Sequence, residues 1–168
     1  MDLIDTPRLK LQMVGKGDEA LYCRLYGDAQ VMRHIAGPLP HETARRSFAI
    51  ACCQAAERPM RRPWWVIREH GRGDAGIVGL VLDREEPEIG VVLAPEAQAR
   101  GLAVEAMDAL ARAAFATGLA SRLWLRHAPG NVAMAAVASR LGATRTQDGT
   151  GPDACRWSLC MEMKSISR

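Results

Sequence analysis

The residues with the clearest chemical potential form a short turn between an apolar run and an alanine-rich helical pattern, Gln98-Ala99-Arg100-Gly101-Leu102-Ala103. The backbone N–H groups that begin a helix have no partners inside the helix, and the helix dipole places partial positive charge beside them. A turn of small residues exposes these groups to an anion such as phosphate, and Gly101 permits a positive φ or a close approach by the ligand. The turn therefore predicts an anion site at the start of the helix.

The turn also restricts the kind of phosphate that it can hold. It contains neither the GxxxxGK[ST] pattern of nucleotide hydrolases nor the GxGxxG pattern of dinucleotide-binding folds. Because the turn offers no serine or threonine to bind magnesium, it favours a pyrophosphate that is held without being cleaved. An ordinary strand-to-helix connection with a glycine turn would explain the same residues without any ligand.

The elements that must position this turn alternate between strands and helices. Period-two alternation and short apolar runs predict strands at Arg8–Val14, Trp64–Glu69, Gly76–Asp83, Glu88–Leu93, Arg122–His127 and Ala154–Met163. Apolar residues at helical spacing predict helices at Asp18–Tyr26, Glu42–Glu57, Leu102–Thr117 and Asn131–Leu141. This order predicts one α/β domain over residues 1–168, with a mostly antiparallel sheet and a strand-helix-strand crossover near its centre.

Composition argues against several classes of protein. The chain has 168 residues, 48% hydrophobic and 24% charged, which is ordinary for a globular domain. Its 22 basic and 19 acidic residues are too balanced to indicate a nucleic-acid partner. No apolar run approaches the roughly 20 residues of a membrane-spanning helix, and the charged N-terminus is unlike a secretory signal. The five cysteines have no CxxC spacing that would indicate a zinc site. We expect a cytoplasmic protein without a metal or a membrane partner.

The turn and its neighbours resemble a known family. Gln98–Ala103 resembles the [QR]xxGx[GA] loop that binds acetyl-coenzyme A in the GNAT N-acetyltransferase superfamily. The preceding Glu88–Glu96 resembles the fourth strand of that superfamily. Further along, Pro129–Asn131 and Arg140–Gly142 are similar to the two ends of its asparagine helix. The resemblance spans nearly the whole chain in order.

Two segments resemble one branch of the superfamily, which contains the ribosomal-protein N-terminal acetyltransferases. Thr6–Leu11 is similar to the opening strand of that branch, and Trp64–Ile67 is similar to its second strand. The chain departs from the branch at three positions. Val104 stands where the branch often has threonine, Met134 where it often has serine, and Ala143 where it often has an aromatic residue.

The resemblance implies a mostly antiparallel sheet, flanked by helices, whose fourth and fifth strands splay apart around the pantetheine arm of acetyl-coenzyme A. Strand main-chain groups would bond the arm, and amides of the turn would hold the pyrophosphate. The implied cofactor-binding residues are Val91, Val92, Leu93, Gln98, Ala99, Arg100, Gly101, Leu102, Ala103, Asn131 and Met134. A solvated side chain is the alternative for Arg100, and a helix N-cap is the alternative for Asn131.

The implied reaction transfers an acetyl group to a neutral amine, which then loses a proton to a base. Glu88 is the first candidate, because the family often uses a glutamate on this strand, commonly through a water; a surface carboxylate is the alternative. His127 is the second candidate by its titration range, and a solvent-facing histidine would explain it equally well. Trp64 and Trp65 are candidate substrate-binding residues. They point to opposite faces of one strand, so one should be core and the other can line the acceptor site.

The acceptor implied by the branch is a primary amine, first the α-amine of a peptide or protein. An α-amine has a pKa of about 8 and a lysine amine one of about 10.4, so the former needs less help to become neutral. A small-molecule amine, such as an antibiotic or a polyamine, comes second. The departures from the branch leave open a protein that binds acyl-coenzyme A without catalysis. The donor is acetyl or a longer acyl group, and the protein is a monomer or a homodimer.

Overall fold

The structure is a computed structural model that describes residues 1–146 and 155–160. In these residues eight strands form one sheet in the order β1-β2-β3-β4-β5-β6-β8-β7. Neighbouring strands are antiparallel except β5 and β6, which are parallel. The strands are β1 Leu3–Asp5, β2 Leu9–Met13, β3 Trp64–Glu69, β4 Gly73–Val81, β5 Glu88–Leu93, β6 Arg122–His127, β7 Thr144–Thr146 and β8 Cys155–Cys160.

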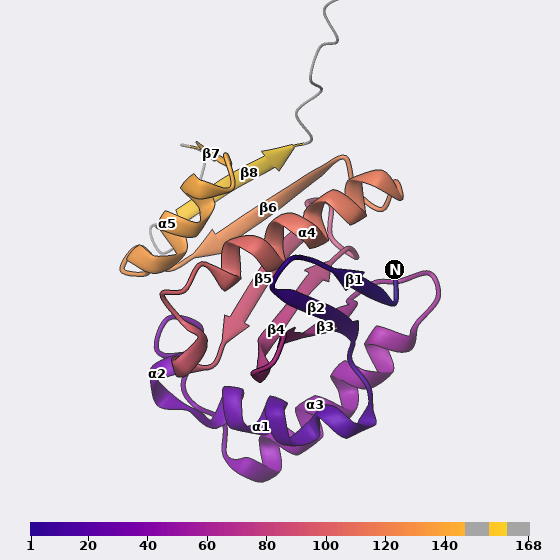
Figure 1. The fold of residues 1–168 in the computed structure, drawn as a ribbon, viewed down its shortest axis with the longest axis vertical. Coiled ribbons are helices and arrows are strands. Elements are labelled where there is room, and N and C mark those ends of the chain that lie inside the picture. The colour runs from indigo at the N-terminus through magenta and orange to yellow at the C-terminus, as the bar shows by residue number, and fades with distance from the viewer. Residues whose placement is uncertain (147–154, 161–168) are drawn as a thin grey trace, which may run out of the picture.

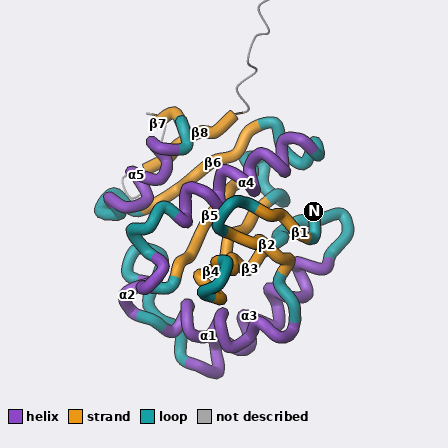
Figure 2. Tube along the Cα trace, in the orientation of Figure 1, coloured by secondary structure: helices purple, strands orange, loops and turns teal. Residues whose placement is uncertain are grey.

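Helices cover both faces of the sheet. Figure 1 shows α4 lying along one face with α5 near it, and α1 and α3 gathered on the other face. Figure 2 shows the same layering, with helices on either side of the strands. The helices are α1 Glu19–Gly27, α2 Ala29–Met32, α3 His41–Ala56, α4 Leu102–Ala116 and α5 Val132–Arg140, with short 3-10 turns at Lys16–Asp18 and Pro95–Ala97.

Two apolar cores hold these layers together. The first lies under α4, whose stripe of Met107, Leu110 and Ala114 is fully buried against the sheet. The second lies under α1 and α3, where Leu25 and Phe48 pack against the opposite face of β3 and β4. The sheet is therefore buried on both sides, as the near-continuous apolar runs of its central strands require.

The parallel strands β5 and β6 separate along their length. β4 pairs with all of β5, whereas β5 and β6 share only the pair between Glu88 and Trp124. The Trp124 amide also donates to the Pro87 carbonyl, at 2.8 Å, so the contact lies where both strands begin. From there the strands diverge toward Leu93 and His127. The predicted mixed sheet, splayed between its fourth and fifth predicted strands, is confirmed.

Most predicted elements are present, three with the predicted bounds: Trp64–Glu69, Glu88–Leu93 and Arg122–His127. The short elements β1, α2 and β7 were not predicted. The last predicted strand includes β8, but its first residue and its last three lie outside the described residues.

A second glycine-rich string, Gly71–Gly76, has the GxGxxG spacing, but it forms the turn and the start of a strand, β4. A dinucleotide-binding turn must be followed by a helix, so this string is not one.

Candidate functional site

A cavity of about 370 Å³ lies where β5 and β6 separate. Its lining comes from Trp64 on β3, from β5 and the following loop, from the end of β6, from α4 and α5, and from the segment between Tyr26 and Ile35, which includes α2. Ten of the predicted site residues line this cavity: Trp64, Val91, Val92, Leu93, Gln98, Ala99, Ala103, His127, Asn131 and Met134. We call it the β5–β6 cavity.

The turn that begins α4 is strained and open. Two of its residues have positive φ, Ala99 at 57° and Gly101 at 77°. The left-handed conformation costs an L-residue such as alanine roughly 1–2 kcal/mol, and such strain concentrates at ligand-binding sites. No side chain caps α4, whose first helical hydrogen bond runs from the Glu105 amide to the Gly101 carbonyl. The amides just before Glu105 are therefore placed to bind an anion.

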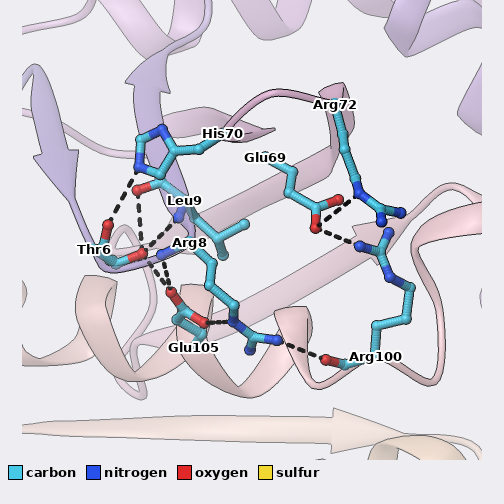
Figure 3. Close-up of polar contacts among 8 residues, drawn as sticks. All are labelled: Thr6, Arg8, Leu9, Glu69, His70, Arg72, Arg100 and Glu105. Atoms are coloured by element: carbon cyan, nitrogen blue, oxygen red, sulfur yellow. Dashed lines mark hydrogen bonds and ion pairs between the residues drawn. The ribbon is translucent and has the colours of Figure 1, made fainter.

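The turn is anchored by residues just before β2, as Figure 3 shows. Arg8 donates from Nη1 to the Arg100 carbonyl at 3.0 Å, and from its backbone N–H and Nε to the Glu105 carboxylate at 2.9 and 2.5 Å. The Thr6 hydroxyl also donates to Glu105, at 2.6 Å. Burial raises the pKa of Glu105, but the hydrogen bonds from Thr6 and Arg8 outweigh it and lower that pKa overall. Arg8 thus ties the backbone of the turn to the first turn of α4.

The Arg100 side chain is held away from the turn. Its guanidinium pairs with Glu69 at the end of β3, and Arg72 contacts the same carboxylate oxygen at 3.9 Å (Figure 3). A phosphate would have to compete with Glu69 for Arg100. Arg100, Gly101 and Leu102 lie outside the lining of the β5–β6 cavity in the described chain, and Leu102 is fully buried.

The end of β5 is tied to the same loop. Gln98 donates from Nε2 to the Leu93 carbonyl at 3.0 Å, which uses a main-chain group that the resemblance assigned to the cofactor arm. The edge of β5 that faces β6 has its single strand pairing, in the described chain, at Glu88. Main-chain groups alternate between the two edges of a strand, so those of Val92 pair with Ile77 of β4, whereas those of Val91 face the β6 edge without a strand partner.

Asn131 is the N-cap of α5, and its Oδ1 accepts from the Met134 amide at 3.1 Å. Asn131 therefore caps α5, as the alternative interpretation of this residue predicted. The cap uses only the amide oxygen, so the Nδ2 group can still donate into the cavity. Met134 lines the cavity and packs against the first core.

His127 is buried, with 7% of its surface exposed, and both ring nitrogens are engaged. The Trp157 indole N–H lies 3.0 Å from Nε2, and Nδ1 lies 2.8 Å from the Ala128 carbonyl. An indole N–H can only donate, so Nε2 must be the unprotonated acceptor and Nδ1 the donor. The one lone pair of this neutral tautomer is occupied. His127 is thus not the solvent-facing residue of the alternative interpretation, nor does it have a free nitrogen to accept a proton.

Glu88 begins β5, with its side chain 17% exposed. Its Oε1 accepts from Arg84 at 2.7 Å and from Arg126 at 3.0 Å. Glu88 is outside the lining of the β5–β6 cavity, whereas its partner Arg126 is part of it. Strand alternation places Glu88 on the same face as Gly90 and Val92, which both line the cavity.

The two tryptophans of β3 have separate roles. Trp65 is fully buried in the first core and donates its indole N–H to the Met1 carbonyl at 2.8 Å, which removes it from the candidate substrate-binding residues. Trp64 lines the cavity. A Cβ at Gly79 would lie 2.7 Å from the Trp64 ring, so the ring lies against β4 only because residue 79 is glycine.

Sequence reasoning missed the part of the cavity lining that comes from residues 26–35. We call this the acceptor wall: Tyr26, Gln30, Val31, Arg33, His34 and Ile35. α2 has only four residues, too few for a helical repeat. One residue in the sequence could have indicated α2. Asp28 is a typical helix N-cap, and its carboxylate accepts hydrogen bonds from the amides of Gln30 and Val31 at 2.7 and 3.0 Å.

The described residues, 1–146 and 155–160, show neither a metal-binding cluster nor a membrane-spanning helix. These residues contain no group of three or more His, Cys, Asp or Glu side chains arranged to hold a metal ion. Within the same ranges, no helix combines the length and the apolar character needed to cross a membrane.

Comparison with known proteins identifies the family. Residues 8–144 match the family described as the acetyltransferase (GNAT) domain. An acetyltransferase from Agrobacterium tumefaciens is similar in structure, with a TM-score of 0.81 and 22% identity over 95% of this chain and 94% of that one. A ribosomal L7/L12 alpha-N-protein acetyltransferase in complex with coenzyme A has a TM-score of 0.80 and 18% identity over 94% of this chain and 97% of that one.

A spermidine N-acetyltransferase from Vibrio cholerae, in complex with coenzyme A and spermine, has a TM-score of 0.76 and 15% identity over 92% of this chain and 96% of that one. A search of curated protein sequences gave no match. At these identities the solved structures establish the fold, and the family match covers most of the chain. The chain therefore belongs to the GNAT acetyltransferase family, whose members are N-acyltransferase enzymes.

Proposed function

We propose that this protein transfers an acetyl group from acetyl-coenzyme A to the α-amine of a peptide or protein. The observation that carries the proposal is the β5–β6 cavity, which has an unpaired strand edge on one side and a strained, uncapped helix start at one end. A gap of this kind suits an extended thioester arm, and the helix start suits its pyrophosphate.

Each part of the cofactor has a partner in this arrangement. The pantetheine arm lies along the open edge of β5 and bonds main-chain groups of Val91. The pyrophosphate lies on the amides of Ala99–Ala103. Asn131 donates from Nδ2 to the arm while Oδ1 caps α5, and Met134 forms an apolar wall beside the sulfur.

The reaction forms a bond from nitrogen to the acetyl carbon and breaks the bond from that carbon to sulfur. The amine proton passes to a base, and coenzyme A leaves as a thiolate. Glu88 is the proposed base, acting through a water. Arg84 and Arg126 both bind Oε1 of Glu88, which orients the carboxylate so that Oε2 can accept the proton. His127 instead helps to shape the cavity wall, because Trp157 occupies its Nε2.

Peptides with free and with blocked N-termini, incubated with acetyl-coenzyme A and analysed by mass spectrometry, test the choice of acceptor. We expect the free peptides to gain an acetyl group and the blocked peptides to stay unchanged. If small amines are acetylated and no peptide is, the acceptor is a small-molecule amine and not a peptide.

Met134→Ser is expected to change kcat by less than about tenfold, or roughly 1.4 kcal/mol. Methionine has no proton to give a departing thiolate, but a free thiol has a pKa of about 8.5, so the thiolate can leave unprotonated. Steady-state kinetics of the variant and of Met134→Leu, which keeps an apolar wall, measure the effect. A wild type inert toward every amine beside an active Met134→Ser would show that an acid is needed and that the native chain only binds the cofactor.

Arg8→Ala is expected to weaken acetyl-coenzyme A binding about tenfold, roughly 1.4 kcal/mol, although Arg8 lies outside the lining of the cavity in the described chain. Without Arg8, the carbonyl of Arg100 loses its hydrogen bond and the turn loses its tie to Glu105. Calorimetry measures the affinity. Arg112→Ala is the matched control, because it breaks an exposed ion pair with Asp108 on the same helix. Equal affinities for Arg8→Ala and the control would show that the turn does not need this anchor.

A further inference from the structure

We propose that the acceptor end of the β5–β6 cavity selects a peptide whose α-amine is followed closely by an acidic side chain, and rejects polycationic amines. The inference rests on the proposed function, because it concerns the acceptor of that reaction. It comes from Arg33 and Tyr26 of the acceptor wall and from Trp64 and Arg126 elsewhere in the lining of the cavity, none of which the proposed cofactor contacts use.

The first observation is the sign of the charges that line the cavity. Among the described lining residues none is Asp or Glu, whereas Arg33 and Arg126 are both present. The charge of Arg126 is balanced by ion pairs with Glu86 and Glu88, each at 3.0 Å. Arg33 is exposed at the end of α2 and has no ion pair among the described residues. Arg33 is therefore the cation of the cavity lining whose charge is left unbalanced within the described chain.

The second observation is a donor without an acceptor. The Trp64 indole N–H is buried, and nothing in residues 1–146 or 155–160 accepts its hydrogen bond. An indole N–H can only donate, so it requires an oxygen or another acceptor atom. Tyr26 lies in the same lining, where burial raises the pKa of its hydroxyl, so that hydroxyl carries no negative charge that would attract an ammonium group. The unpartnered indole N–H suits a carboxylate or carbonyl oxygen better than an ammonium group.

These observations discriminate between classes of amine. A polyamine brings several ammonium groups, and each loses water on entering the cavity without gaining a carboxylate from its lining. The unbalanced charge of Arg33 adds repulsion. A peptide with an acidic side chain near its α-amine brings oxygens that can pair with Arg33. Arg33 directly follows α2 and lines the same cavity as residues 90–93 of β5.

The test uses peptides that differ only in their second residue, Asp, Asn or Lys, together with spermidine. We expect wild-type kcat/KM to be about tenfold or more higher for the Asp peptide than for the Lys peptide, mainly through KM. The preference should shrink as salt is added, because exposed charges are screened. Spermidine should be the poorest acceptor.

Arg33→Glu should erase or reverse the preference for Asp over Lys. Arg33→Met should make kcat/KM nearly equal for the Asp and Lys peptides. Arg46→Glu is the matched control, since Arg46 is 78% exposed on α3 and outside the lining of the cavity. It should keep the wild-type preference. Equal wild-type kcat/KM for the Asp and Lys peptides, or a preference unchanged in Arg33→Glu, would overturn the charge proposal and leave acetyl transfer to peptides in place. Turnover of spermidine with none on any peptide would overturn both the charge proposal and the proposed peptide acceptor.

Discussion

Gly101→Glu is expected to lower the affinity for acetyl-coenzyme A by at least about 100-fold, or roughly 2.7 kcal/mol. Gly101 has a φ of 77°, which strains any residue with a Cβ. A Cβ there would also lie 3.5 Å from Nη2 of Arg8, so a glutamate would compete with Glu105 for Arg8. In the proposed complex, the new carboxylate would repel the phosphates. Isothermal titration calorimetry measures the loss.

Gly118→Glu is the matched control for this substitution. Gly118 has a φ of 71°, lies just past the other end of α4 and has open space around its Cβ position. It therefore takes the same backbone strain and the same charge without touching the turn. The control should bind acetyl-coenzyme A with wild-type affinity even if its melting temperature falls. Wild-type affinity in Gly101→Glu would remove the turn from the cofactor site.

Glu88→Gln is expected to lower kcat/KM by about 100-fold while cofactor affinity stays unchanged, in line with the usual contribution of a general base. A glutamine can still accept hydrogen bonds from Arg84 and Arg126 through its amide oxygen, but it cannot take a proton. The substitution therefore separates proton transfer from the architecture around the start of β5. Kinetics with a free peptide, together with calorimetry of acetyl-coenzyme A, measure the two effects.

His127→Ala distinguishes the other candidate base. It removes the acceptor of the Trp157 indole N–H, so we expect a loss of stability and some loss of activity, with the pH dependence of kcat/KM unchanged. Glu88→Gln should instead lower kcat/KM at every pH, and the acid limb that the α-amine of the peptide produces should remain. An unchanged rate in Glu88→Gln, beside a large loss and an altered pH profile in His127→Ala, would transfer the role of the base to His127.

The sequence predicted those parts of the fold whose signals are local. The stripe of Met107, Leu110 and Ala114 has the helical period, and it forms the buried face of α4. The apolar run Glu88–Leu93 ends at a proline and forms β5. By contrast, β1, α2 and β7 have three or four residues each, too few to show any period. β4 begins at Gly73 instead of Gly76, because pairing with Glu69 extends it through turn-like glycines.

In the candidate site, too, the features set by neighbouring residues were predictable and those set by distant residues were not. The turn around Gly101 was predictable because its conformation depends on neighbouring residues. The anchoring of that turn was not, since Arg8 and Glu105 are 97 positions apart in the chain. Likewise, the tautomer of His127 depends on Trp157, which reaches it across the pairing of β6 with β8. Contacts made only by the folded sheet leave no pattern in a single sequence.

A crystal structure of the protein with acetyl-coenzyme A is the most direct test of where the cofactor binds. We expect the pantetheine arm between β5 and β6, bonded to main-chain groups of Val91. The pyrophosphate should lie on the amides of Ala99–Ala103, with the thioester facing the acceptor wall. A cofactor bound elsewhere, or one whose arm lies outside the gap between β5 and β6, would contradict this account of the site.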